Sequence, residues 1–435
     1  MQDAAAVALR PSTASSQVRV VASLCLAACA VSKIIGFDLP QTRLATDLAT
    51  VGGEKIQLFI YLIAIPVLGL CFYQRRGLAF PSTAGVGFVA LILFAAASTT
   101  WSAYPQTSLL RFAQAFSVPI LIVLTVDVLG WRNVLTILSA VLALAVVLDY
   151  VFVALFPAAK HLTDEIDPAL VGTWRGVHTH KNVAGGVLAA TILIQIDLLR
   201  RRFSSGTLLL LIAAIFFLAM TASKTSIAAA GFCVAVYIIL PAIYRARAAH
   251  LLASLVLICV LTACVAFISA YGDELLAWAT ERDRFTGRGL LWSMSLHHIW
   301  EQPLTGVGFG SFWRVGPAGP SFGFPMADGW SAMAFNGHNG YLDAAAALGL
   351  PGLFLVVTVY VVRPWRAATA ALAAGVAEGR ILTTLIVFLL FHNLFETSFL
   401  NGGSELWFVA NVVTFCAIAA AKEVNSRPGS DRRAS

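Results

Sequence analysis

The sequence predicts an all-α polytopic membrane protein. Its 435 residues are 59% hydrophobic and only 12% charged, whereas a soluble domain carries about 25% charged residues. The apolar residues gather into repeated runs of about 20, the length at which a helix crosses the hydrocarbon core of a bilayer. Length alone would allow two or three soluble domains. The dispersed apolar runs favour one integral membrane domain over residues 1–435 instead.

About twelve transmembrane helices are expected. They cover residues 17–36, 56–73, 79–99, 108–129, 134–156, 183–199, 207–222, 225–243, 251–271, 341–362, 381–400 and 405–421. The seventh and eighth spans are short and share a tight turn. The first run lacks a clear small-residue cleavage site and further spans follow it, so we expect no cleavable signal peptide.

Basic residues predict the orientation of the spans, because Lys and Arg are enriched in cytoplasmic loops. More than half of the 29 Lys and Arg residues fall on one side, for example in Arg75–Arg76 and Arg200–Arg202, while acids such as Asp164 and Asp283 collect on the other. Both termini are therefore expected in the cytoplasm. The net charge of +7 reflects membrane topology, and no nucleic-acid partner is expected.

Three outward segments concentrate polar and aromatic residues. The first is Trp101–Pro105, with Arg111 one turn into the next span. The second, residues 157–182, contains Arg175 near its end. The third, residues 272–340, is the longest non-spanning stretch and is predicted to form a large outward loop.

The large loop contains its own structural signals. Residues 289–301 have the pattern of an amphipathic helix, with Trp292 and Trp300 placed to sit at the lipid headgroups. The run Gly306–Gly310 alternates glycine with apolar residues. Glycine permits the unusual backbone turns that close approach to a ligand requires, so this run is a candidate ligand-proximal turn.

Cations converge on the outward face. Ionisable side chains at membrane depth are costly and are therefore candidates for function. Together they suit an anionic headgroup, above all a pyrophosphate, because Arg makes bidentate phosphate contacts and Lys supplies a point charge. For any single cation, snorkelling of the charged tip to the interface explains the position equally well. The cations are Arg111, Arg175, Lys181, Lys224 and Arg288.

Histidines and acids near the same face allow two interpretations each. His338 stands at the end of the large loop, where an imidazole can act as a general base or orient a hydroxyl, although a lone interfacial histidine is more often structural. His392 and Glu396 are four residues apart and either pair or line a substrate cavity. Asp149 allows the same two interpretations. Asp197 lies near a cytoplasmic helix end and is expected to be solvated.

The outward motifs resemble those of the O-antigen ligase and polysaccharide polymerase superfamily. The run His338–Leu342 with Leu348–Leu353 is similar to the H-N-x-x-L…G-x-x-G signature of that family. Arg175–Asn182 and Thr286–Arg288 resemble further motifs of its outward loops. The pattern is most similar to the exopolysaccharide-production polymerases of the ExoQ type. The order and spacing hold from about residue 98 to 410.

The resemblance implies a GT-C-like fold in the bacterial inner membrane and a metal-independent, inverting glycosyl transfer on the periplasmic side. The donor would be an oligosaccharide on undecaprenyl diphosphate, and the acceptor another lipid-linked repeat. Membrane lipid, chain-length co-polymerases and export proteins are the further partners implied. Asp164, Asp167 and Asp283 lack the spacing of a metal cage, so neither a metal nor another cofactor is expected.

Residue roles carry over by matching position. Arg288 would contact the donor pyrophosphate, and His338 would assist the acceptor or the leaving group, which makes them the predicted catalytic pair. Many relatives have Arg where this chain has Lys224, and Lys lacks the bidentate fork. His392 and Glu396 are possible cavity residues. The predicted substrate-binding residues are Arg111, Arg175, His180, Lys181, Lys224 and Asn339.

Two alternatives stay open. A ligase would use the same chemistry to transfer finished glycan to lipid A core or to protein. A deletion strain would then accumulate long lipid-linked chains, whereas loss of a polymerase would leave single repeats. A transporter or flippase would show inverted repeats and broken helices at the midplane, but the sequence has no clear repeat and its polar groups crowd the outward face.

Overall fold

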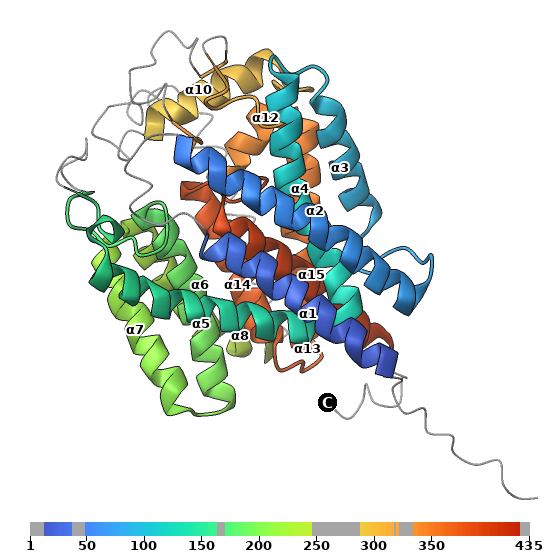
Figure 1. Ribbon diagram of the computed structural model, residues 1–435, viewed down its shortest axis with the longest axis vertical. Coiled ribbons are helices and arrows are strands. Elements are labelled where there is room, and N and C mark those ends of the chain that lie inside the picture. The colour runs from blue at the N-terminus through green and yellow to red at the C-terminus, as the bar shows by residue number, and fades with distance from the viewer. Residues whose placement is uncertain are drawn as a thin grey trace, which may run out of the picture.

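The computed structural model describes residues 13–36, 48–162, 170–245, 288–316, 319–321 and 334–426, and these ranges are almost entirely helical (Figure 1). The only strand-like pairing within them is an isolated bridge between Lys160 and Trp174. The all-α prediction is confirmed. The elements are α1 Thr13–Ile34, α2 Leu48–Arg76, α3 Val86–Ser98, α4 Pro105–Leu129, α5 Trp131–Leu155, η2 Pro157–Ala159, α6 Lys181–Arg201, α7 Ser205–Thr221, α8 Lys224–Arg245, α10 Arg288–Glu301, α12 Gly340–Val357, η5 Thr358–Val362, α13 Arg363–Ala373, α14 Gly379–Phe395 and α15 Glu405–Ser426.

The helices match the expected membrane spans. Eight described helices are long and apolar enough to cross a membrane, and α3, α7 and α14 are shorter apolar helices. In order, they account for every expected span except 251–271, which lies outside the described residues. Helix α10 confirms the amphipathic helix expected at 289–301. The chain is a multi-pass membrane protein.

The bundle has a buried centre and an apolar outer surface. In the most apolar stretches of α6 and α15, 72% of residues are buried, against 28% for α2. On the outer helices, Leu62, Leu93 and Leu209 are each more than half exposed. Apolar faces of this extent are rare on soluble monomers. They are expected where helices face lipid.

The two ends of the bundle differ in chemistry. We call the end at which α4, α6, α12 and α15 begin the loop end, and Figure 1 shows α10 there, beside the ends of α4 and α12. At the opposite end, the basic end, Arg201 pairs with Glu378 at 2.7 Å and Arg132 with Glu423 at 2.9 Å. Basic residues that are far apart in sequence thus share one end, as the topology prediction requires.

The prediction that Asp197 is solvated is wrong. Asp197 is only 1% exposed, and its Oδ1 accepts a hydrogen bond from the Tyr237 hydroxyl at 2.8 Å. Arg200 and Arg201 form ion pairs with the same carboxylate. Asp197 is therefore buried although it lies near the end of α6, because α8 packs over it. Arg200 and Arg201 of the same helix neutralise its charge.

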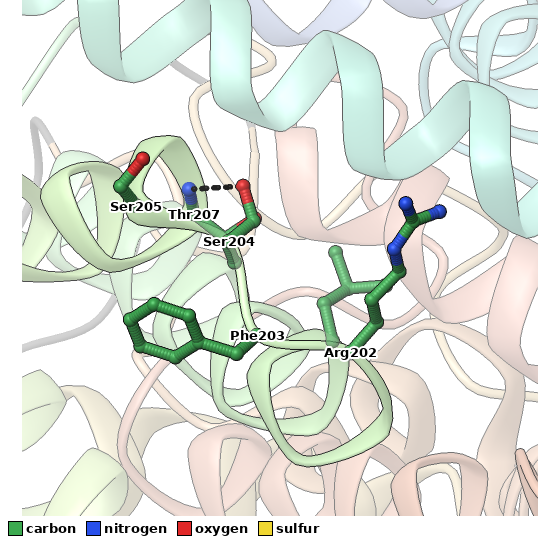
Figure 2. Close-up of a pocket in the computed structure, with 6 residues that line it drawn as sticks. Arg202, Phe203, Ser204, Ser205 and Thr207 are labelled. Atoms are coloured by element: carbon green, nitrogen blue, oxygen red, sulfur yellow. Dashed lines mark hydrogen bonds between the residues drawn. The ribbon is translucent and has the colours of Figure 1, made fainter.

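A shallow hollow lies at the basic end. It is shown in Figure 2, where the Ser204 hydroxyl accepts from the backbone N–H of Thr207 at 3.5 Å and so caps α7. The hollow lies at the Arg201 end of α6, and a helix of 21 residues is about 30 Å long. It is therefore remote from the loop end. Its lining residues are Leu198, Arg202, Phe203, Ser204, Ser205 and Thr207.

Helix α12 is interrupted in its middle. Gly349 has φ +66° and ψ −175°, which is not helical. The carbonyls of Ala346 and Ala347 accept hydrogen bonds from the backbone N–H groups of Val307 and Gly308, each at 3.0 Å. A carbonyl freed in a membrane helix needs such a partner. A broken helix is also a transporter feature, but here a neighbouring loop occupies the break.

The glycine-rich run makes the turns that the sequence predicted. Gly306, Gly308 and Gly310 have φ values of +60°, +97° and +62°. Between them, the N–H of Phe309 donates to Ser98 Oγ at 3.0 Å, and its carbonyl accepts from Ser108 at 2.5 Å. The run is therefore fixed against α3 and α4 as well as α12.

Candidate functional site

Glu396 is the acceptor around which the candidate site is built. Helix α14 ends at Phe395, and Glu396 follows with an extended backbone (φ −145°, ψ 160°). Its side chain is only 11% exposed. A buried carboxylate needs charged or hydrogen-bonding partners, because isolated burial of its charge is very costly.

Three side chains from distant segments bind this carboxylate. Arg288 Nη2 lies 2.6 Å from Glu396 Oε1, and Asn182 Nδ2 donates to the same oxygen at 2.9 Å. His338 Nδ1 lies 2.8 Å from Oε2. We call Glu396, Arg288, His338 and Asn182 the Glu396 cluster. The structure thus brings together Arg288 and His338, the pair predicted from sequence, on one carboxylate.

The Glu396 carboxylate is ionised at neutral pH. Burial would raise its pKa, but the charge and hydrogen bond of His338 and the charge of Arg288 outweigh burial and lower the pKa of Glu396 to about 2. Hydrogen bonds to a charged group are also shorter and stronger than neutral ones. One stable anion therefore fixes the positions of a guanidinium and an imidazole.

His338 is held by a constrained stretch of backbone. Its φ is +50°, which is uncommon for any residue except glycine. Its backbone N–H donates to Asn336 Oδ1 at 3.0 Å. The next residue, Asn339, caps α12 by accepting from the N–H groups of Tyr341 and Leu342, each at 3.1 Å. In the form of the ring that carries a single proton, on Nδ1 and directed at the carboxylate, Nε2 is a proton acceptor.

Ser223 fixes the orientation of the Asn182 amide. Its hydroxyl donates to Asn182 Oδ1 at 3.0 Å, which directs Nδ2 at Glu396. Ser226 Oγ lies 3.0 Å from Ser223 Oγ. Gly185 leaves room for this chain of contacts, because a Cβ there would lie 2.6 Å from Ser226 Oγ. Asn182 lies in a motif that carried the family resemblance, yet sequence reasoning assigned neither it nor Ser223 a role.

His180 caps the start of α6 beside the cluster. Its Nδ1 accepts from the N–H of Asn182 at 3.2 Å. Burial and then the nearby His161 lower the pKa of His180 to about 4, so the ring is neutral at pH 7. Because Nδ1 is the acceptor, the proton lies on Nε2. His180 therefore presents an N–H donor. The following Lys181 donates its backbone N–H to His161 Nε2 at 3.3 Å.

Two of the predicted substrate-binding arginines contact backbone carbonyls. Arg111 Nη1 donates to Gly310 at 2.5 Å and to Trp313 at 2.8 Å. Arg175 Nε donates to Ala158 at 2.9 Å. These contacts fix the outward loops. That either arginine also binds substrate stays a prediction.

The other predicted residues are near the cluster in different ways. Lys224 is exposed at the start of α8, next to Ser223. Asn339 Nδ2 donates to a backbone carbonyl of α14 at 3.2 Å. His392 is buried, and its Nδ1 lies 3.3 Å from Ser398 Oγ. The carboxylate of Glu396 therefore bonds to its three donors, whereas its backbone N–H donates to the carbonyl of His392 at 2.8 Å.

A second buried cluster holds the loop that leads into α6. His178 lies between Asp149 of α5 and Glu405 of α15, with N–O distances of 3.6 and 3.7 Å, which are ion-pair distances. Asp149 Oδ1 also accepts from the N–H of Val177 at 2.9 Å. Gly176 is required there, because its φ is +60° and a Cβ would lie 2.1 Å from Asp149 Oδ1. Asp149 thus braces the fold, which is one of its two predicted interpretations.

Asp343 in the first turn of α12 organises the opposite side of the site. It accepts from Trp313 Nε1 at 2.8 Å, from the Thr397 hydroxyl at 2.6 Å and from the N–H of Gly337 at 3.0 Å. Thr397 directly follows Glu396, and Gly337 directly precedes His338. These are the two residues whose side chains pair at 2.8 Å in the Glu396 cluster. Sequence reasoning missed Asp343, although an acid in the first turn of a span is itself a signal.

The part of the chain that the structure describes contains no preformed metal site. There, no group of three or more His, Cys, Asp or Glu side chains is arranged to hold a metal ion. The expectation that the chemistry is metal-independent stays a prediction.

A segment that contains the predicted catalytic pair is similar to a known protein family. Residues 207–357 match the family model described as O-antigen ligase. The match to the O-antigen ligase model contains Lys224, Arg288 and His338. Asn182 and Glu396 lie outside the matched residues, so the cluster joins the matched segment to the helices on either side of it.

One curated relative agrees with this match. Over 100 residues the chain is 33% identical to the exopolysaccharide production protein ExoQ of Rhizobium meliloti (strain 1021). The alignment covers 23% of this chain and 23% of that protein. The chain therefore aligns with less than a quarter of the length of this relative, and both comparisons agree with the resemblance seen in the motifs.

Proposed function

We propose that this chain is a polysaccharide polymerase that joins lipid-linked oligosaccharide repeats at the periplasmic surface of a bacterial inner membrane. The observation that carries the proposal is the pairing of Arg288 and His338 with opposite oxygens of Glu396. The O-antigen ligase match over residues 207–357 and the similarity to an exopolysaccharide production protein support it. The positive-inside rule supports an orientation with the basic end in the cytoplasm and the loop end outside.

Arg288 serves the donor in this proposal. A guanidinium has five N–H donors in a planar fork, and one nitrogen of Arg288 holds Glu396. The remaining donors suit the diphosphate of an undecaprenyl-linked glycan. As the bond between the anomeric carbon and the phosphate oxygen breaks, its electron pair passes to the diphosphate. A fixed cation stabilises that developing charge and lowers the barrier.

His338 serves the acceptor. Glu396 holds Nδ1–H, so Nε2 takes the proton from the attacking sugar hydroxyl. The hydroxyl oxygen forms the new bond to the anomeric carbon on the face opposite the departing diphosphate, which inverts the configuration. The products are the elongated glycan on one lipid and a free lipid diphosphate, and the proton leaves His338 to water.

Reconstitution tests the proposal. The purified chain in phospholipid nanodiscs is given synthetic undecaprenyl-diphosphate oligosaccharide with EDTA present, and products are separated by chain length on a gel. We expect a ladder from the wild type. Losing a general base or a charge-stabilising donor costs on the order of 10²–10⁴ in rate, so Arg288→Ala and His338→Gln should form almost no ladder.

The matched control is His297→Gln, because His297 is an exposed histidine on α10 whose side chain is 52% exposed. This variant should polymerise like the wild type. A full ladder from well-folded Arg288→Ala would refute the site assignment. No ladder from the wild type, with every substrate supplied, would refute the polymerase proposal.

A ligase is the second candidate, because the matched family model is itself described as O-antigen ligase. The same chemistry would then transfer glycan to lipid A core. In the reconstituted system, product that forms only after lipid A core is added identifies a ligase, and a ladder from lipid-linked repeats alone identifies a polymerase.

A further inference from the structure

Helix α10 has an apolar edge that faces away from the protein. Leu296 and Trp300 are four residues apart, and 37% and 83% of their surfaces are exposed. Leu304, just after the helix, is 69% exposed. On the inner side, Leu291 and Met294 are fully buried against the loop and α12. We call Leu296, Trp300 and Leu304 the apolar edge.

The neighbouring edge of the same helix is polar. His297 and Glu301 each follow a residue of the apolar edge by one position, and so lie about 100° further round the helix. His297 Nε2 lies 3.3 Å from Glu301 Oε1, and the two side chains are 52% and 55% exposed. Helix α10 is therefore divided lengthwise into a side that contacts protein, an apolar edge and a polar edge. A helix that lies in the surface of a bilayer needs this division.

The apolar edge continues into the surface of a membrane span. The N–H of Leu350 in α12 donates to the carbonyl of Pro303 at 2.7 Å, which joins the end of the apolar edge to α12. Leu350 is 50% exposed, and Phe354 one turn later is 69% exposed. Both belong to the segment Gly340–Ala373, which is long and apolar enough to cross a membrane. Lipid that covers Phe354 would therefore reach the apolar edge.

The two tryptophans of α10 have different surroundings. The indole Nε1 of Trp292 donates to the carbonyl of Gly337 at 3.0 Å, so this indole is engaged by the protein, and its expected place at the headgroups stays a prediction. Trp300 is almost fully exposed. Its amphipathic ring suits the boundary between headgroups and acyl chains.

We propose that α10 lies in the plane of the outer leaflet, with Leu296, Trp300 and Leu304 seated at the boundary between headgroups and acyl chains. Arg288 is the first residue of α10, and Trp300 lies about 18 Å along the helix from it. A helix that lies flat with Trp300 at this boundary keeps Arg288 at the height of the lipid phosphates. The next step rests on the proposed function. The seating of α10 presents the Arg288 guanidinium to the diphosphate of the donor, at the depth where the donor's lipid tail anchors that diphosphate.

Spin labels measure the seating directly. In a variant of the full chain without cysteines, Trp300→Cys and His297→Cys each receive a nitroxide, and the protein is placed in phospholipid nanodiscs. The accessibility of each label to oxygen, which partitions into lipid, is compared with its accessibility to a water-soluble nickel complex. We expect a several-fold higher ratio of oxygen to nickel at 300 than at 297. An equal or lower ratio at 300 overturns the proposal, and so does spin–spin broadening at 300 that reveals a second copy of the chain.

A second measurement serves if the cysteine-free chain does not fold. A photoreactive diazirine amino acid at 300 or 297, in a chain with its natural cysteines, should form phospholipid adducts at 300 and few at 297. Neither measurement uses catalysis, so failure of the polymerase proposal leaves the seating of α10 standing. Equal lipid adducts at both positions would contradict that seating.

The link to the donor has its own test. Trp300→Glu should raise the KM for undecaprenyl-linked donor about 5- to 10-fold, since 1.4 kcal/mol corresponds to tenfold, whereas Trp300→Phe should not. The effect should vanish with a short-chain, water-soluble diphosphate donor. An equal effect on both donors would show that Trp300→Glu damages the site itself and does not act by changing the height of Arg288 in the membrane.

Discussion

The hydroxyl of Ser223 donates to Asn182 Oδ1 at 3.0 Å and thereby decides that the amide N–H₂, not the oxygen, faces Glu396. A rotated amide would direct its oxygen at the carboxylate and repel it. The orientation of Glu396 between Arg288 and His338 thus depends on a residue of a fifth segment, directly before α8.

Substitution of Asn182 should reveal this dependence. A hydrogen bond to a charged group is worth about 1.5–3 kcal/mol, so Asn182→Ala should lower the polymerisation rate by about 10- to 100-fold. Asn182→Asp should cost more, because it places a second carboxylate beside Glu396, and the loss should ease at acidic pH as the two carboxyls share a proton. The measurement is the pH profile of ladder formation. Parallel profiles for the Ala and Asp variants would contradict the charge argument, and Ser226→Ala, one step further away, is the mild control.

Neutralising Glu396 should disable the site without changing its shape. Glu396→Gln leaves Arg288 without its counterion and lets the imidazole of His338 rotate or change tautomer. By analogy with the loss of the orienting acid in a catalytic triad, we expect a fall in rate on the order of 10²–10⁴. The initial rate of lipid-linked donor consumption measures it. Glu301→Gln, an exposed acid on α10, should retain full activity, and an active Glu396→Gln variant would remove Glu396 from the mechanism.

Acid should destabilise the fold partly through His180. Its pKa is about 4 in the folded chain, and about 6.5 when unfolded. The folded state therefore binds fewer protons between these values, so its stability is complete above pH 6.5 and declines as the pH falls towards 4. From pH 7 to 5 this costs about 2 kcal/mol, at 1.36 kcal/mol per pH unit.

The comparison of His180→Asn with the wild type tests this dependence, because Asn can still cap α6. The measured quantity is the drop in melting temperature between pH 7 and pH 5 in detergent. The drop should be smaller for the variant. Equal drops in the two proteins would show that His180 does not contribute, and His297→Gln should behave as the wild type.

The break in α12 should tolerate no side chain. Gly349→Ala would place a Cβ 2.7 Å from the carbonyl carbon of Leu304, at a φ of +66°. Strain of this kind costs about 1–3 kcal/mol before any clash is counted. We expect a lower melting temperature and reduced membrane yield. Gly69→Ala in α2, where a Cβ would meet nothing within 4 Å, should change neither, and similar behaviour of the two variants would contradict the strain argument.

The sequence predicted the spans, the α10 helix and the pair Arg288 and His338, because apolar length and motif spacing are local signals. It left Glu396 between two interpretations, since the i,i+4 argument assumes that the helix continues. Helix α14 stops at Phe395, and Glu396 turns towards segments more than 50 residues away. Asn182 and Ser223 show the same limit, because their roles depend on which helices lie side by side in the fold.

The hydrogen-bond partners of charged and aromatic residues were equally hard to predict. Asp197 was expected to be solvated at a helix end, and Trp292 was expected at the lipid headgroups. Both are engaged by partners across the fold, Tyr237 and Gly337. The helical period and the position of a residue indicate on which face of the helix its side chain lies. They do not indicate whether another element covers that face.

The hydrogen bonds from Val307 and Gly308 to the interrupted α12 have a consequence for protein engineering. A transplanted loop that follows a different path would leave the carbonyls of Ala346 and Ala347 without these partners, and each unpaired buried polar group costs about 1–3 kcal/mol. The loop and the first half of α12 therefore form one structural unit. Chimeras that transplant residues 303–349 as one cassette should insert and fold, whereas loop swaps that end before Gly340 should be degraded.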